Sequence, residues 1–510
     1  MKRLCLLLLL LPALAACQWM TEDYTDDNFP DADAARYINI TVSVSAGSSP
    51  LTRAPLGGEY GDGVEQALEN EYAVKDITLI FYQLADGASL DNPGENATVL
   101  CVKKYDVQPT TNHDHTHTGA PDGYTDKEVV YTTGDQRLDE TTLVAGEKYH
   151  VLVVANATPN VAAGDKLTDV RDRLMTLAYT DTGSGAGVGA SGITAKDFVM
   201  TSEDDAVVSF DNRRVDTEKN TITYYFECIH IERLAARIDF WAKNSNGYKT
   251  GTETVANRYA TNPGYEYTIY EVNGTTKTDT GDRFVLTAIT PFNLNNGNEY
   301  MLKRVATGFE AGATVAYLGD ETITNYVLDP YIAAKTDQQH PDNLVSTLAD
   351  VATLTSFNSA FSVSMASQQG NKLSVGTETG IVKDDIVICY PKENTLKPGT
   401  RLYYYATGLA FEGYYYENGQ TTGTRVVFYY FIRHQGESAT ATAYEAWSKE
   451  DLDAQKATLV CPEPTAMNYG IVRNNIYRIS IESVSILRGK LKLRLEEEKW
   501  RHVDNPTITI

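Results

Sequence analysis

Short stretches in which apolar and polar residues alternate recur along the chain, and each of them predicts a β-strand. The first stretch runs from Tyr37 to Ser45. One side of it carries only β-branched aliphatic residues: Ile38, Ile40, Val42 and Val44. The positions between them are polar: Asn39, Thr41 and Ser43. Because successive side chains of a strand point to opposite faces, this pattern is typical of a strand with one buried face.

Further strands are expected in both halves of the chain. Residues Tyr149–Ala155 are almost continuously apolar, which predicts a strand in the middle of a sheet. Alternation predicts other strands at 76–82, 222–228, 477–481 and 491–495. The stretches 411–417 and 424–432 flank Asn418-Gly419, which predicts a hairpin with a long loop.

Helices are expected to be few. The best candidate is Asp169–Ala178, whereas residues 106–147 are polar and typical of a loop. The stretch Ile229–Ala242 is expected to join two halves of the chain. Together these patterns predict a mainly β fold of two domains, mostly antiparallel β-sandwiches, with few short helices.

The beginning of the chain is typical of an exported bacterial lipoprotein. Lys2 and Arg3 precede the apolar run Leu4–Leu11, and Leu14-Ala15-Ala16-Cys17 has the pattern of a lipobox. This pattern predicts a signal peptide over residues 1–16 and a lipid on the Cys17 thiol. An ordinary secretory signal is the alternative, and the apolar run is too short to span a membrane. Residues 18–36 are acidic and are expected to form a tether.

Charge and composition exclude several classes of function. The chain has 68 acidic and 44 basic residues, which gives a net charge of −24. Such a chain repels phosphate backbones, so no nucleic-acid partner is expected. The P-loop, GxSxG, HExxH and EF-hand patterns are absent from the sequence, so we expect no enzymatic activity and no cofactor. A GxGxxG match at Gly187–Gly192 lacks the preceding strand and following helix that nucleotide binding needs.

Neither the cysteines nor the histidines predict a firm metal site. No cysteine pair has CxxC spacing, so zinc-type ligation is not expected. Four cysteines lie beyond Cys17, and both two disulfides and buried free thiols are compatible with them: Cys101, Cys228, Cys389 and Cys461. Three histidines would share one face of an extended chain and are the weak metal candidates: His113, His115 and His117. An exposed loop without a metal is the favoured interpretation, because no other ligand is near in sequence.

The tyrosine clusters and two isolated histidines could have either structural or functional roles. The chain has 33 tyrosines, and they cluster at 403–405 and 414–416. These clusters could stack on sugars, but tyrosine-rich strands more often build sheet faces. His150 and His230 lie in predicted strands and are expected to be packed, hydrogen-bonded side chains.

Several short segments follow the lipobox in a characteristic order. They are Leu51-Thr52-Arg53-Ala54, Lys75–Leu79, Tyr149–Ala157, Phe198–Thr201, Glu232–Ile238 and Arg473–Tyr477. In this order the sequence resembles the Bacteroidetes major fimbrial subunit family, which includes the FimA-type and minor-fimbrium pilins of type V pili. The resemblance spans nearly the whole chain, and long polar insertions at 106–147 and 246–350 depart from it.

The resemblance implies two transthyretin-like β-sandwich domains and a polymerisation mechanism. An Arg-specific protease would cut between Arg53 and Ala54 and release a propeptide, residues 17–53, that contains the strand Tyr37–Ser45. The N-terminal domain, residues 54–235, would then present an acceptor groove. A donor strand near residues 500–510, in the C-terminal domain 236–510 of another subunit, would fill that groove. The donor side chains would be Val503, Ile508 and Ile510.

The resemblance also implies partners and a location. The precursor would sit on the outer membrane through its lipid, and the mature chain would join other fimbrial subunits in a surface fimbrium that supports adhesion to a host or bacterial ligand. Burying four aliphatic side chains contributes on the order of 6–12 kcal/mol gross, so strand exchange without cleavage would be slow. Proteolysis is therefore the expected trigger.

The sequence is also compatible with other functions. The chain could be a surface lipoprotein that binds glycans without polymerising, or an anchor or tip component of a fimbrium. An anchor would keep its lipid and lack a functional cut at Arg53, and a tip would lack a usable donor strand. The presence of Arg53 and of an apolar C-terminal tail favours a stalk subunit.

Overall fold

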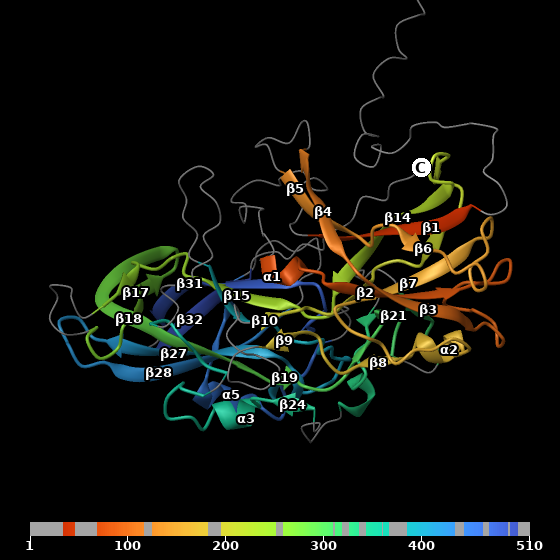
Figure 1. The fold of residues 1–510 in the computed structure, drawn as a ribbon. Helices are drawn as coiled ribbons and strands as arrows, with labels where there is room; N and C mark the ends of the chain where they lie inside the picture. The colour runs from red at the N-terminus through yellow and green to blue at the C-terminus, as the bar shows by residue number, and fades with distance from the viewer. Residues whose placement is uncertain are drawn as a thin grey trace, which may run out of the picture.

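Two large β-sheets dominate the computed structural model of the chain and lie side by side (Figure 1). The structure describes residues 34–45, 69–116, 125–181, 195–250, 259–309, 312–318, 326–335, 343–359, 361–366, 385–433, 443–462, 469–487 and 490–497. Within these ranges the chain is mainly β with a few short helices, so the predicted fold class is confirmed.

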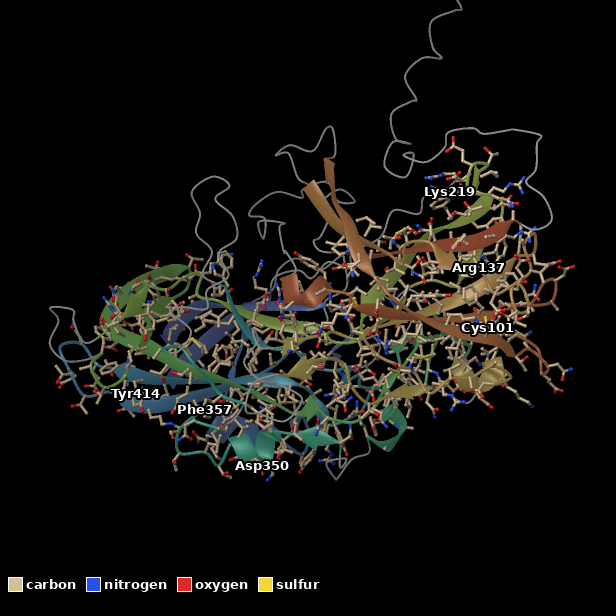
Figure 2. All side chains as sticks on the ribbon, viewed as in Figure 1. Cys101, Arg137, Lys219, Asp350, Phe357 and Tyr414 are labelled. Atoms are coloured by element: carbon tan, nitrogen blue, oxygen red, sulfur yellow. The ribbon has the colours of Figure 1, made fainter. Side chains whose placement is uncertain are left out.

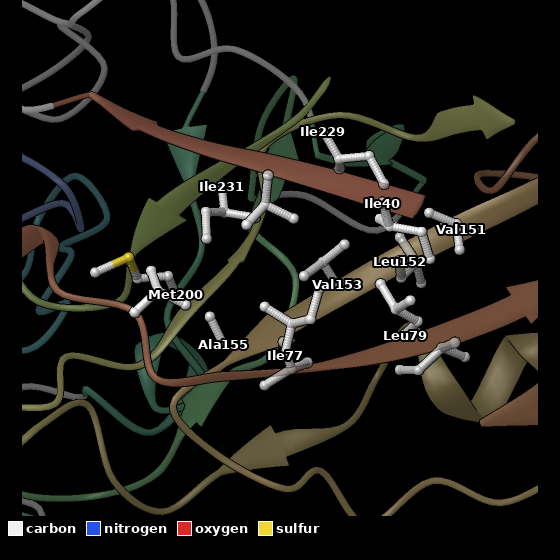
Figure 3. Packing of buried hydrophobic residues seen from close by; sticks show 14 of the residues in the cluster. Ile40, Ile77, Leu79, Val151, Leu152, Val153, Ala155, Met200, Ile229 and Ile231 are labelled. Carbon is white, nitrogen blue, oxygen red and sulfur yellow. The ribbon is translucent and has the colours of Figure 1, made fainter. Parts of the chain in front are cut away.

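The first sheet is built from the N-terminal half of the described chain. Along its main path the order is β3 (Val99–Asp106), β2 (Asp76–Tyr82), β7 (Tyr149–Ala155), β11 (Met200–Ser202), β14 (Thr221–Arg233), β1 (Ala35–Ser45), β5 (Thr125–Thr132) and β4 (Gln108–Thr116). Three short strands join beside this path: β6 (Gln136–Arg137), β12 (Ala206–Val208) and β13 (Arg213–Asp216). The short β11 pairs with both β7 and β14, and the β1–β14 part lies across from the β2–β7 part (Figure 3). The apolar core of this half lies between these two parts.

The second sheet is built mainly from residues beyond 236. Its main path is β26 (Asp385–Cys389), β15 (Arg237–Trp241), β31 (Ile476–Leu487), β17 (Gly264–Asn273), β18 (Thr276–Phe292), β27 (Gly408–Tyr416), β28 (Thr424–Phe431) and β30 (Trp447–Ser448). Beside it lie β16 (Tyr248–Lys249), β25 (Val363–Ser364), β29 (Ala443–Glu445) and β32 (Lys490–Glu497). Most strand pairs are antiparallel, but β1–β14, β15–β31 and β17–β31 are parallel.

The remaining elements are short. The strands are β8 (Leu174–Met175), β9 (Thr180–Asp181), β10 (Ala195–Lys196), β19 (Leu294–Asn295), β20 (Glu299–Tyr300), β21 (Arg304–Ala306), β22 (Val315–Tyr317), β23 (Tyr326–Val327) and β24 (Leu344–Val345). The helices are α1 (Glu69–Tyr72), α2 (Leu167–Val170), α3 (Leu348–Val351), α4 (Leu402–Tyr405), α5 (Lys449–Gln455) and the 3-10 turn η2 (Ile332–Ala334). Within the part of the chain that the structure describes, none of the helices has the length and apolarity needed to cross a bilayer.

The hydrophobic pattern predicted several strands correctly. β7 lies between β2 and β11, as its continuous apolar run predicts. β27 and β28 form the predicted hairpin, in which Leu409 pairs with Tyr430, and Gly419 in its loop adopts a φ of 77°. A positive φ is costly for residues with a Cβ, which explains glycine at this position.

Two sequence predictions were wrong. The expected helix 169–178 shrinks to α2, because Leu174 and Met175 pair with β20 instead of continuing the helix. Residues 106–147 are not simply a loop, because they contain the β4–β5 hairpin. Its second strand pairs with β1, so a contact distant in sequence stabilises a segment that is too polar to predict as a strand.

Buried charges accompany the crossing from one sheet to the other. β14 ends at Arg233 in the first sheet, and β15 begins at Arg237 in the second. The Arg237 guanidinium donates to both carboxylate oxygens of Glu71, at 2.9 and 3.0 Å, and is bound again by Asp239. The three side chains are at most 4% exposed. This cluster ties α1 of the first half to β15 of the second.

A buried carboxyl close to this crossing has a shifted pKa. Glu299 is fully buried on β20, and one of its carboxylate oxygens accepts the backbone N–H of Glu393 at 3.0 Å. Burial raises the pKa of Glu299 to about 7, although the Arg473 guanidinium pulls it down. The folded chain therefore holds a proton that the unfolded chain has already lost between pH 4.5 and about 7.

We expect the free energy of unfolding to fall as the pH rises through that range because of Glu299. A shift of this size corresponds to on the order of 3 kcal/mol. Glu299→Gln mimics the protonated acid, so the variant should gain about that much relative to the wild type between about pH 5 and about pH 8. Urea denaturation of both chains at the two pH values measures this. An equal pH dependence in both chains would contradict the assignment.

Candidate functional site: the slot filled by β1

β1 lies in the interior of the first sheet and not at an edge. It pairs in parallel with β14, from Ala35 opposite Thr221 to Val44 opposite Ile231. On its other side it pairs in antiparallel fashion with β5 and with the short β6. We call the space between β14 and β5–β6 the β1 slot. A strand in this slot satisfies two rows of backbone groups, so its loss without replacement would leave both rows unpaired.

The inner face of β1 is fully apolar and fully buried. Its four side chains are at most 1% exposed: Ile38, Ile40, Val42 and Val44. Ile40 projects from β1 toward Val151 and Leu152 of β7, and all belong to the core of the first half (Figure 3). The alternation seen in the sequence therefore corresponds to one buried face.

The other face of β1 makes specific polar contacts. Asn39 donates to Asp135 at 3.0 Å and accepts from the Thr132 hydroxyl at 2.6 Å. Ser43 lies opposite His230 in the ladder, and its Oγ is 2.7 Å from the His230 Nδ1. Ser43 is only 1% exposed. The outer face of the strand is therefore enclosed at Ser43, whereas Asn39 and Thr41 are half-buried.

The N-terminal end of β1 is held by the segment 133–140. Arg36 forms an ion pair of 2.8 Å with Glu140, and the Arg137 guanidinium lies over the ring of Tyr37. Exposed pairs of this kind contribute about 0–1 kcal/mol each. The buried inner face therefore dominates the hold on the strand.

Several predicted site residues lie outside the described residues. They are Cys17, Arg53, Ala54, His117, Val503, Ile508 and Ile510. Arg53 stands in the sequence between the end of β1 at Ser45 and the start of α1 at Glu69. A cut after Arg53 would therefore separate β1 from the rest of the chain.

The weak metal candidates lie on the β4–β5 hairpin as far as the structure describes them. In the ladder, His113 is opposite Glu128, and His115 is opposite Asp126. Among the described residues, no three side chains of the metal-binding types gather into a possible ion site.

Three of the six clustered tyrosines are part of the core, and the other three are half-buried. Tyr403, Tyr405 and Tyr416 are buried, the first two on α4 and the third at the end of β27. Tyr414 is half-buried at the second sheet (Figure 2). A sugar-stacking platform needs exposed rings, so the buried members of these clusters favour the sheet-building interpretation.

His150 and two of the cysteines also have structural roles. His150 stacks on Tyr82 and contacts Asp205 at 3.0 Å, as expected for a packed histidine. Cys101 and Cys389 are buried free thiols. Burial raises the pKa of both thiols, so neither is an activated nucleophile.

The sequence pattern did not predict the two strands that pair with β1 on the side opposite β14. β5 and β6 cover one side of β1, and Ser43 and His230 meet although they are 187 residues apart. The alternation of Val129 and Tyr131, both buried, was the available signal for β5. Sequence spacing gave no signal for the pairing of Ser43 with His230.

The chain is similar to solved structures of fimbrial proteins. One is the tip fimbrial protein Mfa3 from Porphyromonas gingivalis with a C-terminal truncation, at 11% identity and a TM-score of 0.34, covering 91% of this chain and 100% of that one. Another is a fimbrilin (fimA) from Porphyromonas gingivalis W83, at 11% identity and a TM-score of 0.31, covering 89% and 90%. A third is a fimbrial assembly protein from Parabacteroides distasonis, at 9% identity and a TM-score of 0.28, covering 91% and 98%.

These three are fimbrial proteins and not enzymes. No protein-family model matches the chain, and no curated protein matches it in sequence. At this level of similarity, the functions of the three proteins do not transfer to this chain.

Proposed function

We propose that the chain is a structural subunit of a cell-surface fimbria that polymerises by donor-strand exchange. In this proposal it is exported as a lipoprotein precursor, held at the outer membrane through Cys17 and cut after Arg53 by an Arg-specific protease. Residues 54–235 and 236–510 act as its two domains. Other fimbrial subunits are its partners, and the fimbria supports adhesion to a host or bacterial surface.

The observation that carries the proposal is the place of β1 in the chain and in the sheet. β1 is the first described strand, yet it lies in the interior of a sheet whose other strands come from residue 76 onward. Its only covalent link to that sheet passes through the segment that contains Arg53. One cut there converts an integral strand into a separate peptide.

The energetics of β1 explain why the cut β1 peptide would be replaced by another strand and would not simply dissociate. Burial of its four aliphatic side chains contributes on the order of 6–12 kcal/mol gross. The cut peptide therefore stays bound until another strand supplies both the ladder hydrogen bonds and the apolar side chains. A C-terminal strand of a second subunit is the proposed replacement.

A non-polymerising, glycan-binding lipoprotein is less well supported. Its expected stacking platforms include Tyr405 and Tyr416, which are completely buried. An anchor or tip role differs from the stalk role in whether Arg53 is cut and whether the tail is used as a donor. Both differences are measurable.

Deleting Val503–Ile510 from the unlipidated precursor is expected to abolish polymers and leave a folded, cleavable monomer. The donor is lost, but the β1 slot and both sheets are unchanged. Polymers are counted by size-exclusion chromatography after digestion with an Arg-specific protease. Arg53→Ala serves as the matched control that keeps the tail but cannot be cut at this position. Normal polymers from the deletion would refute the donor assignment.

A further inference from the structure

The β1 slot selects the register of its strand through polar contacts. All four inner side chains of β1 are β-branched and aliphatic, so a shift by two residues would place similar side chains in similar sites. The outer contacts differ from one position to the next. Asn39 meets Thr132 and Asp135, Thr41 donates to the Phe226 carbonyl at 3.5 Å, and Ser43 meets His230. A strand with other residues at these three outer positions would lose these polar contacts.

The end of the given sequence repeats this polar pattern. Residues Asn505–Ile510 read Asn-Pro-Thr-Ile-Thr-Ile, and residues Asn39–Val44 read Asn-Ile-Thr-Val-Ser-Val. Asparagine and threonine recur at the same two outer positions, and a hydroxyl residue recurs at the third. At the inner positions, Ile508 replaces Val42 and Ile510 replaces Val44. The preceding Asp504 would fall at the apolar Ile38 site, so the match begins at Asn505.

The proline in this segment falls where a strand in the slot tolerates it. Pro506 corresponds to Ile40, whose backbone N–H donates to a side chain, the Thr133 hydroxyl, at 3.1 Å. This position also borders the register shift between Ile40 and Val42 in the β1–β14 pairing. Proline within a sheet is confined to edges and to irregular positions of this kind.

Resting on the proposed function, we propose that Asn505–Ile510 of a second copy occupies the β1 slot in the register of Asn39–Val44 and parallel to β14. Asn505 then meets Thr132 and Asp135, and Thr509 meets His230. The opposite direction would place Asn505 at the Ser43 position, which is only 1% exposed and is filled by a smaller side chain.

A disulfide scan in the full chain tests the register. In a Cys228→Ala background, Thr509→Cys is combined with His230→Cys, the chain is cut after Arg53 and then oxidised. The expected result is a ladder of covalent oligomers on a non-reducing denaturing gel. Thr507→Cys with His230→Cys is the matched control for a shift by two residues and should give no ladder. Ser43→Cys with His230→Cys should close within the uncut precursor, because these positions are ladder partners.

The outcomes separate this inference from the proposed function. Polymers that form without the Thr509–His230 cross-link, while the precursor control closes, would overturn the register and leave strand exchange intact. A ladder from the Thr507→Cys chain would do the same. A cross-linked monomer would mean that the tail enters its own slot, which overturns the role of the second copy. Failure of the cut wild-type chain to polymerise would overturn both proposals.

Discussion

Arg237→Met is expected to lower the free energy of unfolding of the unlipidated precursor by about 3–5 kcal/mol, because it removes the guanidinium that binds two buried carboxylates. Arg237 binds Glu71 of α1 and Asp239 of β15, and all three side chains are nearly inaccessible. Urea denaturation followed by tryptophan fluorescence measures the loss. A double variant that also carries Glu71→Gln should recover part of it, since one buried charge is removed.

A surface ion pair is the matched control for this experiment. Lys449 and Asp453 lie one turn apart on α5, with side chains 53% and 42% exposed. Lys449→Met is expected to cost no more than about 0.5 kcal/mol. Equal effects of Lys449→Met and Arg237→Met would show that the buried cluster does not hold the two halves together.

Ile40→Ala is expected to destabilise the uncut precursor by about 2–4 kcal/mol and to leave the stability of the assembled polymer unchanged. The cost arises because Ile40 is completely buried and its truncation leaves a cavity in the core of the first half. The polymer should be unaffected, because β1 has left it. Thermal unfolding of the precursor and heat dissociation of the polymer are the two measurements.

Leu79→Ala is the matched control for Ile40→Ala. Leu79 lies on β2 in the same core and is also completely buried, but β2 stays in the chain after the cut. Leu79→Ala should therefore destabilise both the precursor and the polymer. If Ile40→Ala weakened the polymer as much as Leu79→Ala does, β1 would still be part of the polymer.

The sequence predicts the strands whose own side chains carry the pattern. β1 and the β27–β28 hairpin follow from alternation, and β7 follows from its continuous apolar run, because burial at alternate or successive positions is encoded locally. The β4–β5 hairpin was missed because its formation depends on the pairing of β5 with β1, more than 80 residues earlier in the chain. Local propensity carries no trace of such a partner.

The candidate site was predictable in part. The inner face of β1 follows from Ile38, Ile40, Val42 and Val44, since an apolar face has to be buried. The contacts of Asn39 and Ser43 do not follow, because their partners lie 93 and 187 residues away. The Glu71–Arg237 contact at the crossing between the sheets spans 166 residues and escapes sequence reasoning for the same reason.

The measurement that tests the central claim most directly is limited digestion of the unlipidated precursor with an Arg-specific protease, followed by intact mass and an unboiled gel. The account predicts one cut after Arg53, loss of the peptide that contains β1, and a ladder of oligomers. A chain that is cut after Arg53 but keeps the β1 peptide and stays monomeric would contradict it.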